Sequence, residues 1–444
     1  MTTPLPDGFR IEVDARQVDA TTLFGGAPAR FLRLSPAGAT AWRELRDGPV
    51  ASRAAGILAR KLTDAGLAHP RPPAVHPPEV TVIIPVRDRT DMLADCLAAV
   101  GDHRVIVVDD GSRDPKAVAD VVAKHGAKLV ARTENGGPAA ARNDGLAHAS
   151  SGIVAFLDSD CVPPPGWITT LAGHFVDPLV AAVAPRVVPV PETPWAGGLD
   201  LGDRPARVVP GTRVAYVPTA ALLVRRDALA DMLFDTDLRH GEDVDLVWRL
   251  HERGWRIRYD PSVHVRHREP ATWQGLLARR FRYGTSAGPL SRRHPAAMAP
   301  LALLPWHALT VAALLAGSPL AALTFTAAVD DTARKLAAAH VPESEALTAT
   351  VTSIRQTWLG ASRYGTQFAA PLLLAALLVP GKPRRAAAAL LLSRPVAAYL
   401  ARRPAMNPIR FALGSIADDI AYGAGVWTGC VRARTTTPVR PIVP

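Results

Sequence analysis

Four apolar stretches between residues 80 and 160 constrain the fold of this chain more than any other feature of its sequence. Each is short, rich in Val, Ile, Leu or Ala, and separated from the next by a segment of helical character. Strands that are apolar almost throughout and alternate with helices form parallel sheets covered on both faces. We therefore predict an α/β domain with a mostly parallel sheet, built from VTVIIPV, HRVIVVDDGS, AKLVAR and GIVAFLDSD.

The chain has 444 residues, enough for two or three domains. TTLFGGAPARFLRLS predicts two short strands about Gly25 and Gly26, and Ser35 with Pro36 begins a helix that ends near Asp47. A second helix is expected from residue 50 to residue 64, followed by a Pro-rich linker at 69–78. We expect three parts: a small N-terminal module with its linker (1–77), the α/β domain (78–290) and a hydrophobic helical region (291–444).

The last third of the sequence contains long apolar runs at 301–329, 368–380 and 386–400, the first of them free of charged residues. Such runs indicate association with a membrane, and the prolines within them favour in-plane or re-entrant helices over spans. A bundle of Ala- and Leu-rich core helices is the alternative. On the membrane reading, basic side chains would face cytoplasmic lipid headgroups: Arg292, Arg293, Lys382, Arg384 and Arg385.

Charge and cysteine content indicate which kind of partner this protein binds and in which cellular compartment it is found. The formal net charge is +11, mostly from arginine, which suits phosphate oxygens. No run interleaves dense Lys and Arg with aromatic residues, so we expect no nucleic acid partner. The three cysteines have no metal or disulfide spacing, and the N-terminus has no secretory pattern. We expect a protein at the cytoplasmic face of the cell membrane, with its α/β domain in the cytosol.

Asp158 and Asp160 follow the fourth apolar stretch directly. Residues two apart in an extended chain project to the same side, so both carboxylates can converge on one ligand. Mg2+ or Mn2+ takes such oxygen ligands and completes its shell with water or substrate phosphates. The pattern therefore predicts a binding site for a metal ion with a diphosphate. Paired aspartates at the end of a strand also serve as turn or helix caps.

Two further motifs end or follow strands of the same sheet. Asp109 and Asp110 precede a Gly-Ser turn, where a carboxylate can accept from a uracil imide or a ribose hydroxyl; one of the two is readily explained as a cap. ENGGPAAARNDG places glycines before a helix and presents Arg142 to phosphate or base. A plain loop explains this turn equally well.

The segment HGEDVDLVWRLHERGW places Glu242 and Asp243 at the start of an amphipathic helix. A carboxylate there is favoured by the helix dipole without any catalytic role. Beside a bound donor, however, Asp243 is well placed to take a proton from an acceptor hydroxyl.

Basic side chains follow this helix. His267 ends a short alternating strand and is a candidate metal ligand, with His264 as its competitor. Arg279, Arg280 and Arg282 are candidates to clamp a diphosphate, or form a solvated or lipid-facing surface.

The order of these motifs resembles that of the family 2 glycosyltransferases, over residues 80–284. That family has a GT-A fold, binds a nucleotide-sugar at a D-x-D metal site, and transfers the sugar with inversion. The resemblance implies Asp243 as general base, Asp158 on the ribose, and Asp160 and His267 on Mg2+ or Mn2+. It also implies a nucleoside pocket lined by Pro85, Arg87, Asp109, Asp110 and Arg142. The chain lacks the Q-x-x-R-W motif of processive members, and RRFRYG stands roughly in its place.

The N-terminal segment resembles the winged-helix peptide-recognition domains that partner radical-SAM enzymes. Its fusion to a family 2 glycosyltransferase and an apolar C-terminal region is similar to the glycosyltransferases of mycofactocin systems. This similarity implies transfer of glucose from UDP-glucose to premycofactocin or its precursor, a peptide-derived acceptor, giving a short β-1,4-glucan, in an actinobacterial source. A transferase acting on a lipid carrier or cell-wall glycan and a non-catalytic peptide-binding scaffold are the alternatives.

Overall fold

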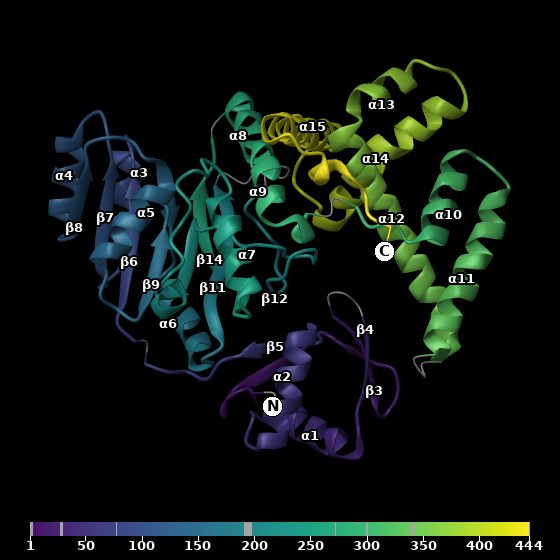
Figure 1. Ribbon diagram of the computed structural model, residues 1–444, viewed down its shortest axis with the longest axis horizontal. Coiled ribbons are helices and arrows are strands. Elements are labelled where there is room, and N and C mark those ends of the chain that lie inside the picture. The colour runs from purple at the N-terminus through teal and green to yellow at the C-terminus, as the bar shows by residue number, and fades with distance from the viewer. Residues whose placement is uncertain are drawn as a thin grey trace. The chain divides into compact units, whose positions relative to one another are not determined.

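The structure, a computed structural model, describes residues 3–26, 30–76, 78–190, 198–270, 272–298, 301–338 and 342–443. The chain divides into two compact units (Figure 1). The first unit takes in the described residues up to Glu269, and the second takes in those from Pro270 on. The N-terminal module and the α/β part therefore belong to the same unit.

Two capped helices form the centre of the N-terminal module, α1 (Pro36–Asp47) and α2 (Arg53–Ala65). Ser35 Oγ accepts from the Gly38 N–H at 3.1 Å, which confirms the predicted start of α1. α2 begins after Ser52, slightly later than expected, and ends at Gly66 in the left-handed region (φ 70°), as Gly-terminated helices commonly do. Apolar side chains from both helices and the N-terminal strands make a core that includes Leu5, Phe9, Trp42 and Leu62.

Short antiparallel strands complete the module. One sheet has the order β2 (Arg16–Gln17), β3 (Thr22–Gly25) and β4 (Arg30–Arg33), which confirms the two strands expected here. The other pairs β1 (Arg10–Val13) with β5 (Ala68–Arg71). Two helices with small antiparallel sheets are compatible with a winged helix, which stays a prediction.

The start of the expected linker is a strand instead. β5 includes His69, Pro70 and Arg71, which the sequence places in a Pro-rich linker, and its partner β1 lies far away along the chain. Pro70 is tolerated because the pair has only two strands and each is an edge. The linker interpretation is therefore wrong for residues 69–71, because a non-local partner decides their conformation.

Two ion pairs, one of them fully buried, join the module to the α/β part of the first unit. Arg60 on α2 donates from Nη1 and Nη2 to Asp177 at 2.7 and 2.8 Å, and both side chains are buried. Arg256 donates through Nε and Nη2 to Asp64 at 2.7 and 2.6 Å. A planar fork on a carboxylate fixes orientation as well as distance. The module is thus docked on the sheet and not merely tethered to it.

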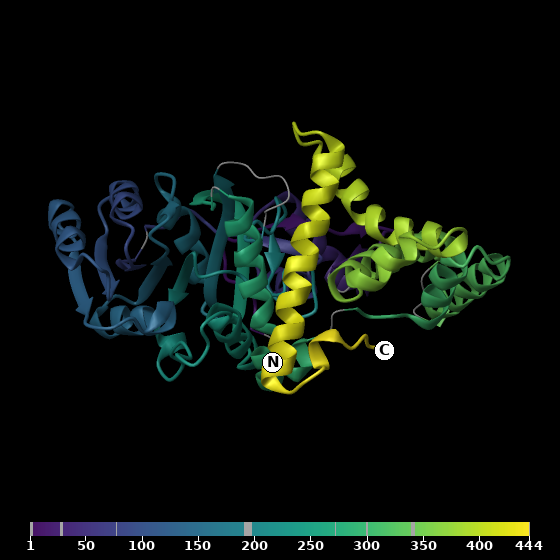
Figure 2. The ribbon, with the colours of Figure 1, turned by 90° about the horizontal axis from the view of Figure 1, so that it is seen from above.

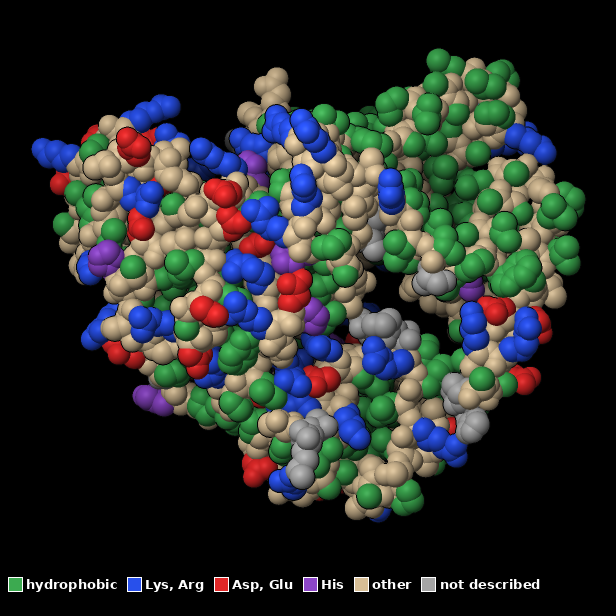
Figure 3. Space-filling view, in the orientation of Figure 1, with side chains coloured by type: hydrophobic (Ala, Val, Ile, Leu, Met, Phe, Trp, Pro, Cys, Tyr) green, Lys and Arg blue, Asp and Glu red, His purple; other side chains and the backbone are tan. Residues whose placement is uncertain are grey.

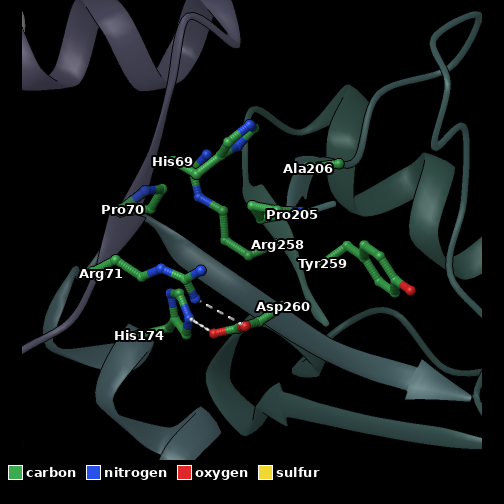
Figure 4. Close-up of a pocket in the computed structure, with 9 residues that line it drawn as sticks. All are labelled: His69, Pro70, Arg71, His174, Pro205, Ala206, Arg258, Tyr259 and Asp260. Carbon is green, nitrogen blue, oxygen red and sulfur yellow. Dashed lines mark hydrogen bonds and ion pairs between the residues drawn. The ribbon is translucent and has the colours of Figure 1, made fainter. Parts of the chain in front are cut away.

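A small pocket lies beside these ion pairs, lined by β5 on one side and by the edge of the large sheet on the other (Figure 4). Asp260 lies 2.9 Å from His174 Nε2 and accepts from Arg71 at 3.3 Å. Arg258 is only 2% exposed, and its side-chain nitrogens have no hydrogen-bond partner among the described residues. Burial lowers the pKa of this guanidinium to about 10, so it stays charged at neutral pH.

One large sheet dominates the first unit, in the order β10-β14-β11-β13-β9-β6-β7-β8, with β12 on β14. The pairs β6–β7, β6–β9, β7–β8 and β11–β14 are parallel, whereas β13 is antiparallel to both its neighbours. The expected mostly parallel α/β sheet is confirmed. The strands are β6 (Val80–Val86), β7 (Arg104–Asp110), β8 (Lys128–Arg132), β9 (Ile153–Leu157), β10 (Cys161–Val162), β11 (Val180–Val190), β12 (Ala206–Arg207), β13 (Ala221–Arg225) and β14 (Arg256–Arg268).

Helices cover the sheet and bring the chain back between parallel strands, as Figure 1 shows. β6, β7 and β9 are buried almost throughout because both of their faces are covered. Gly145 lets one helix approach the sheet closely, since an added Cβ would lie 2.3 Å from Ile83 Cγ2. The helices are α3 (Thr90–Val100), α4 (Pro115–Lys124), α5 (Gly137–His148), α6 (Trp167–Ala172) and α7 (Glu242–Glu252).

The second unit is helical. α8 and α15 pack with their backbones in contact, because a Cβ on Gly284 would lie 2.2 Å from Tyr422 O and one on Gly425 would lie 2.0 Å from Phe281 O. Figure 2 shows α15 along its length. The helices are α8 (Trp273–Thr285), α9 (Ala287–Arg293), α10 (Pro305–Leu315), α11 (Leu320–Ala338), α12 (Ala346–Phe368), α13 (Ala370–Leu377), α14 (Lys382–Arg402) and α15 (Pro408–Ala433).

The surface of the second unit carries many exposed apolar side chains. Leu372 is 73% exposed and Leu378 is 80% exposed. Figure 3 shows hydrophobic side chains gathered over α13 and α14. Within the described ranges, no helix combines the length and the apolarity that crossing a bilayer requires.

Candidate active site

The carboxyl end of β9 carries the two aspartates expected to bind the donor. Asp158 accepts from Arg142 Nη2 at 2.7 Å, and Arg142 Nη1 donates to Glu242 at 2.9 Å. Arg142 is buried between the two carboxylates and lies over the ring of Phe234. Burial raises the pKa of Asp158, and the charge of Arg142 acts against this rise. Arg142 therefore connects the end of β9 to the start of α7.

Asp160 lies close to His267, the last but one residue of β14. The distance from Asp160 Oδ1 to His267 Nε2 is 3.6 Å, and β10 pairs with β14 so that Cys161 is opposite His267. Glu269 lies 3.2 Å from the other ring nitrogen, Nδ1. His264, the competing candidate, is exposed three residues earlier on the strand and so projects from the opposite face.

The fit of a divalent cation rests on Asp160 Oδ1, a buried oxygen without a hydrogen-bond partner among the described residues. A histidine held by a carboxylate at its second nitrogen is the usual arrangement of a metal-binding imidazole. Across the ranges that the structure describes, no group of three or more His, Cys, Asp or Glu side chains forms a complete site. Mg2+ commonly uses one or two protein carboxylates and takes its other ligands from phosphates and water. These residues therefore fit a cation that arrives with a diphosphate.

α7 begins with Glu242 and Asp243, as the sequence predicts. Asp243 is half-buried and its Oδ1 accepts from the Val244 N–H at 2.8 Å. Burial, and then the neighbouring charge of Glu242, raises the pKa of Asp243 to about 7, while Arg142 acts in the opposite direction. A carboxylate with a pKa near neutral pH is suited to accept a proton during a reaction.

The paired aspartates at the end of β7 have different surroundings. Both oxygens of Asp110 are occupied, since they accept from the Gly136 and Gly137 N–H groups at 2.8 Å each. Asp109 is buried, and its Oδ1 accepts from the Ser112 N–H at 3.0 Å. Asp110 thus holds the Gly-rich turn before α5, which leaves Asp109 as the better candidate to contact a nucleobase.

The other residues expected to bind the nucleotide-sugar lie on or just after β6 and on α8. Pro85 is half-buried near the end of β6, and Arg87 is exposed just after it. Arg279 and Arg280 lie on α8 in the second unit, where Arg280 pairs with Asp418 at 2.8 Å and Arg279 lies over the ring of Tyr283. The structure therefore gives both of these arginines neighbours within the helical unit, and their expected contact with a diphosphate stays a prediction.

Three contacts of this site were not foreseen from the sequence, and two of the side chains that make them, Glu269 and Arg89, were not among the predicted residues. Glu242 binds Arg142, Glu269 binds His267, and Arg89 binds Asp160 at 2.5 Å. Only Glu269 had a local signal, because it is two residues after His267 and lies on the same side of an extended chain. The partners of the other two are distant in sequence, so spacing alone does not connect them.

Comparison with known proteins identifies the family. The Glycosyl transferase family 2 model matches residues 81–233, which include the ends of β6, β7 and β9. The pre-mycofactocin glycosyltransferase of Mycobacterium tuberculosis is 39% identical over 99% of this chain and 98% of its own length. This chain belongs to the family 2 glycosyltransferases. The expected family and the expected enzyme class are thus confirmed, and the protein is a nucleotide-sugar-dependent glycosyltransferase.

More distant relatives match smaller shares of this chain. Glycosyltransferase AglE of Haloferax volcanii is 32% identical over 47% of this chain and 72% of its own length. Among solved structures, the mannosyltransferase PcManGT of Pyrobaculum calidifontis, in complex with GDP-Man and Mn2+, is 23% identical over 80% of this chain and 89% of its own, with a TM-score of 0.46.

Proposed function

We propose that this glycosyltransferase moves glucose from UDP-glucose to premycofactocin or its precursor, with inversion and with Mg2+ or Mn2+, and builds a short β-1,4-glucan. The observation that carries the acceptor is identity over nearly the full length of both chains to a protein named pre-mycofactocin glycosyltransferase. The likeness includes the N-terminal module, which we propose is a winged-helix-like domain that recognises the peptide-derived acceptor.

The donor would lie at the carboxyl ends of β6, β7 and β9, the usual ligand position in an open α/β sheet. Asp109 would contact the uracil and Asp158 the ribose, with Pro85 and Arg87 beside the nucleoside. Arg142 would act indirectly, because it is buried and orients Asp158 and Glu242. Asp160 and His267 would hold the cation, which when bound neutralises charge on the leaving diphosphate.

Asp243 would be the general base. A hydroxyl of the acceptor attacks the anomeric carbon on the face opposite the diphosphate, and its proton passes to a carboxylate oxygen of Asp243 as the new bond forms. The bond to the diphosphate breaks through an oxocarbenium-like state and its electrons leave with the nucleoside diphosphate, and attack from the opposite face inverts the configuration at the anomeric carbon. The raised pKa of Asp243 makes it a stronger base than an ordinary aspartate.

The substitution Asp243→Asn tests this assignment. We expect transfer to fall about 100-fold or more, because a neutral amide cannot take the proton, while metal-dependent binding of UDP is retained. Sugar transfer is measured by mass spectrometry and UDP binding by calorimetry. Asp237→Asn, an exposed aspartate before the same helix, is the matched control. An Asp243→Asn enzyme with normal transfer would remove Asp243 from the mechanism.

A donor and acceptor screen tests the substrates. Purified protein is incubated with Mn2+, several nucleotide-sugars and the matured cofactor precursor, and products are weighed by mass spectrometry. Hexose increments with UDP-glucose support the proposal. Metal-dependent hydrolysis of the donor without an adduct would favour a lipid carrier or cell-wall glycan as acceptor, an alternative that the exposed apolar surface of the second unit supports.

We also propose that the second unit rests on the cytoplasmic face of an anionic membrane. Leu372, Leu374 and Leu378 are exposed apolar side chains that precede the exposed basic residues Lys382 and Arg385. Apolar side chains beside basic ones suit the boundary between acyl chains and anionic headgroups. Flotation with phosphatidylglycerol vesicles should carry the protein upward, and Leu378→Glu should weaken this. Equal flotation of both proteins, or none, would contradict the proposal.

A further inference from the structure

Arg89 occupies one oxygen of the carboxylate expected to hold the metal. Its Nη1 donates to Asp160 Oδ2 at 2.5 Å, and the side chain is 53% exposed. The other oxygen, Asp160 Oδ1, is buried, faces His267 and has no hydrogen-bond partner among the described residues. One carboxylate therefore has an exposed cation on one side and a position for a second cation on the other.

The turn that carries Arg89 is held in a costly conformation. Asp88 has φ 57°, in the left-handed region that residues other than glycine rarely adopt. Its N–H donates to Ser112 Oγ at 2.9 Å, and its Oδ1 accepts from the Arg113 N–H at 2.7 Å. Such a conformation persists where neighbouring groups fix it, and it is common at functional sites. The loop after β7 thus holds the turn, and Arg89 follows as the N-cap residue of α3.

We propose that Arg89 is the counter-ion of Asp160 in the metal-free enzyme and moves to the diphosphate of the donor when metal and nucleotide bind. This inference rests on the proposed metal-dependent transfer from a nucleotide-sugar. Arg89 has two roles in this scheme: it controls the charge at the metal site before the donor arrives, and it contacts the donor afterwards.

Simple electrostatics explains the exchange. A guanidinium on Asp160 neutralises the carboxylate and repels a divalent cation placed on the same group, so the cation alone binds weakly. A diphosphate changes both the pairing of Arg89 and the binding of the cation. It offers Arg89 a new anionic partner with matching geometry, and it gives the cation further oxygen ligands. An exposed arginine can change partner without leaving a buried charge unpaired. Metal and nucleotide should therefore bind cooperatively, each strengthening the other.

The substitution Arg89→Gln separates this role from a merely structural one. The proposal predicts effects of opposite sign on two affinities, since Mn2+ should bind more tightly and UDP more weakly. Without nucleotide, Mn2+ should bind the variant about tenfold more tightly than the wild type, since the repelling charge is gone. In the presence of saturating Mn2+, UDP should bind about tenfold more weakly, since the diphosphate loses an arginine. Free Mn2+ is measured by electron paramagnetic resonance and UDP binding by calorimetry.

The matched control is Arg104→Gln. It removes the same charge from an exposed residue at the start of β7, the end of the strand away from Asp109 and Asp110. It should change neither affinity, and thermal unfolding shows that both variants fold. If Arg89→Gln leaves the Mn2+ affinity unchanged or weakens it while Mn2+ still promotes UDP binding, only the role of Arg89 is overturned. If neither the wild type nor the variant binds Mn2+ even with UDP present, both the role of Arg89 and the metal dependence of the proposed function are overturned.

Discussion

Glu242 should control the pH at which Asp243 becomes an active base. The pKa of Asp243 is raised from 3.8 to about 7, chiefly by burial and next by the charge of Glu242. Glu242→Gln removes that charge while its amide oxygen can still accept from Arg142, so the positive charge of Arg142 is compensated less and acts more fully on Asp243. Both changes favour the ionised aspartate and should lower its pKa.

We expect the pKa to fall by about one unit, since Glu242 is one of several causes of the rise and one unit corresponds to about 1.4 kcal/mol. A general base works when ionised, so the rate should increase with pH and level off above the pKa of Asp243. In Glu242→Gln this rise should lie at lower pH. At pH 6 the ionised fraction of Asp243 should be about fivefold larger than in the wild type.

The assay is kcat/KM for sugar transfer between pH 5 and pH 9, because this ratio reports the ionisation of the free enzyme. Glu252→Gln, which removes a charge at the far end of the same helix, is the control and should leave the profile in place. Thermal unfolding of each variant separates a shifted profile from partial unfolding. A profile of Glu242→Gln that stays in place or moves to higher pH would refute this account of the pKa.

Two stability predictions address the first unit. Arg60→Met should lower the free energy of unfolding by about 3–5 kcal/mol, because it leaves Asp177 buried without its ion pair. Arg53→Met, an exposed change on the same helix, should cost little, and equal melting temperatures would contradict the buried pairing. Gly145→Ala should cost about 1–3 kcal/mol, because its Cβ would lie 2.3 Å from Ile83 Cγ2. Gly152→Ala, where nothing lies within 4 Å, is its control, and a neutral Gly145→Ala would show that α5 can move off the sheet.

The sequence predicted the elements whose cause is local. The strands β6, β7 and β9 follow from apolar runs that are buried almost throughout, the edge strand β8 follows from a shorter apolar run, and the start of α1 follows from Ser35 and Pro36. Asp158 and Asp160 do follow β9 as predicted, but the extended-chain argument for them is wrong: Ser159 and Asp160 lie in a turn, which the Cys161 N–H closes by donating to Asp158 O at 3.0 Å.

What the sequence could not show depends on partners that lie far along the chain. β5 exists because it pairs with β1, so its composition alone indicates a linker. β14 is longer than the short strand expected before His267, because it pairs in parallel with β11 over most of its length despite an irregularity beside Pro185 and Arg186. Spacing also could not show that Arg142 would be buried between two carboxylates.

The glycine contacts between α8 and α15 determine when the second unit can be completed during synthesis. α8 leaves the ribosome long before α15, and the backbone surface around Gly284 is uncovered until Gly425 arrives. Closing a contact between such distant segments is entropically costly and late in folding. The arginines of α8 therefore acquire fixed positions only after the first unit is already able to fold.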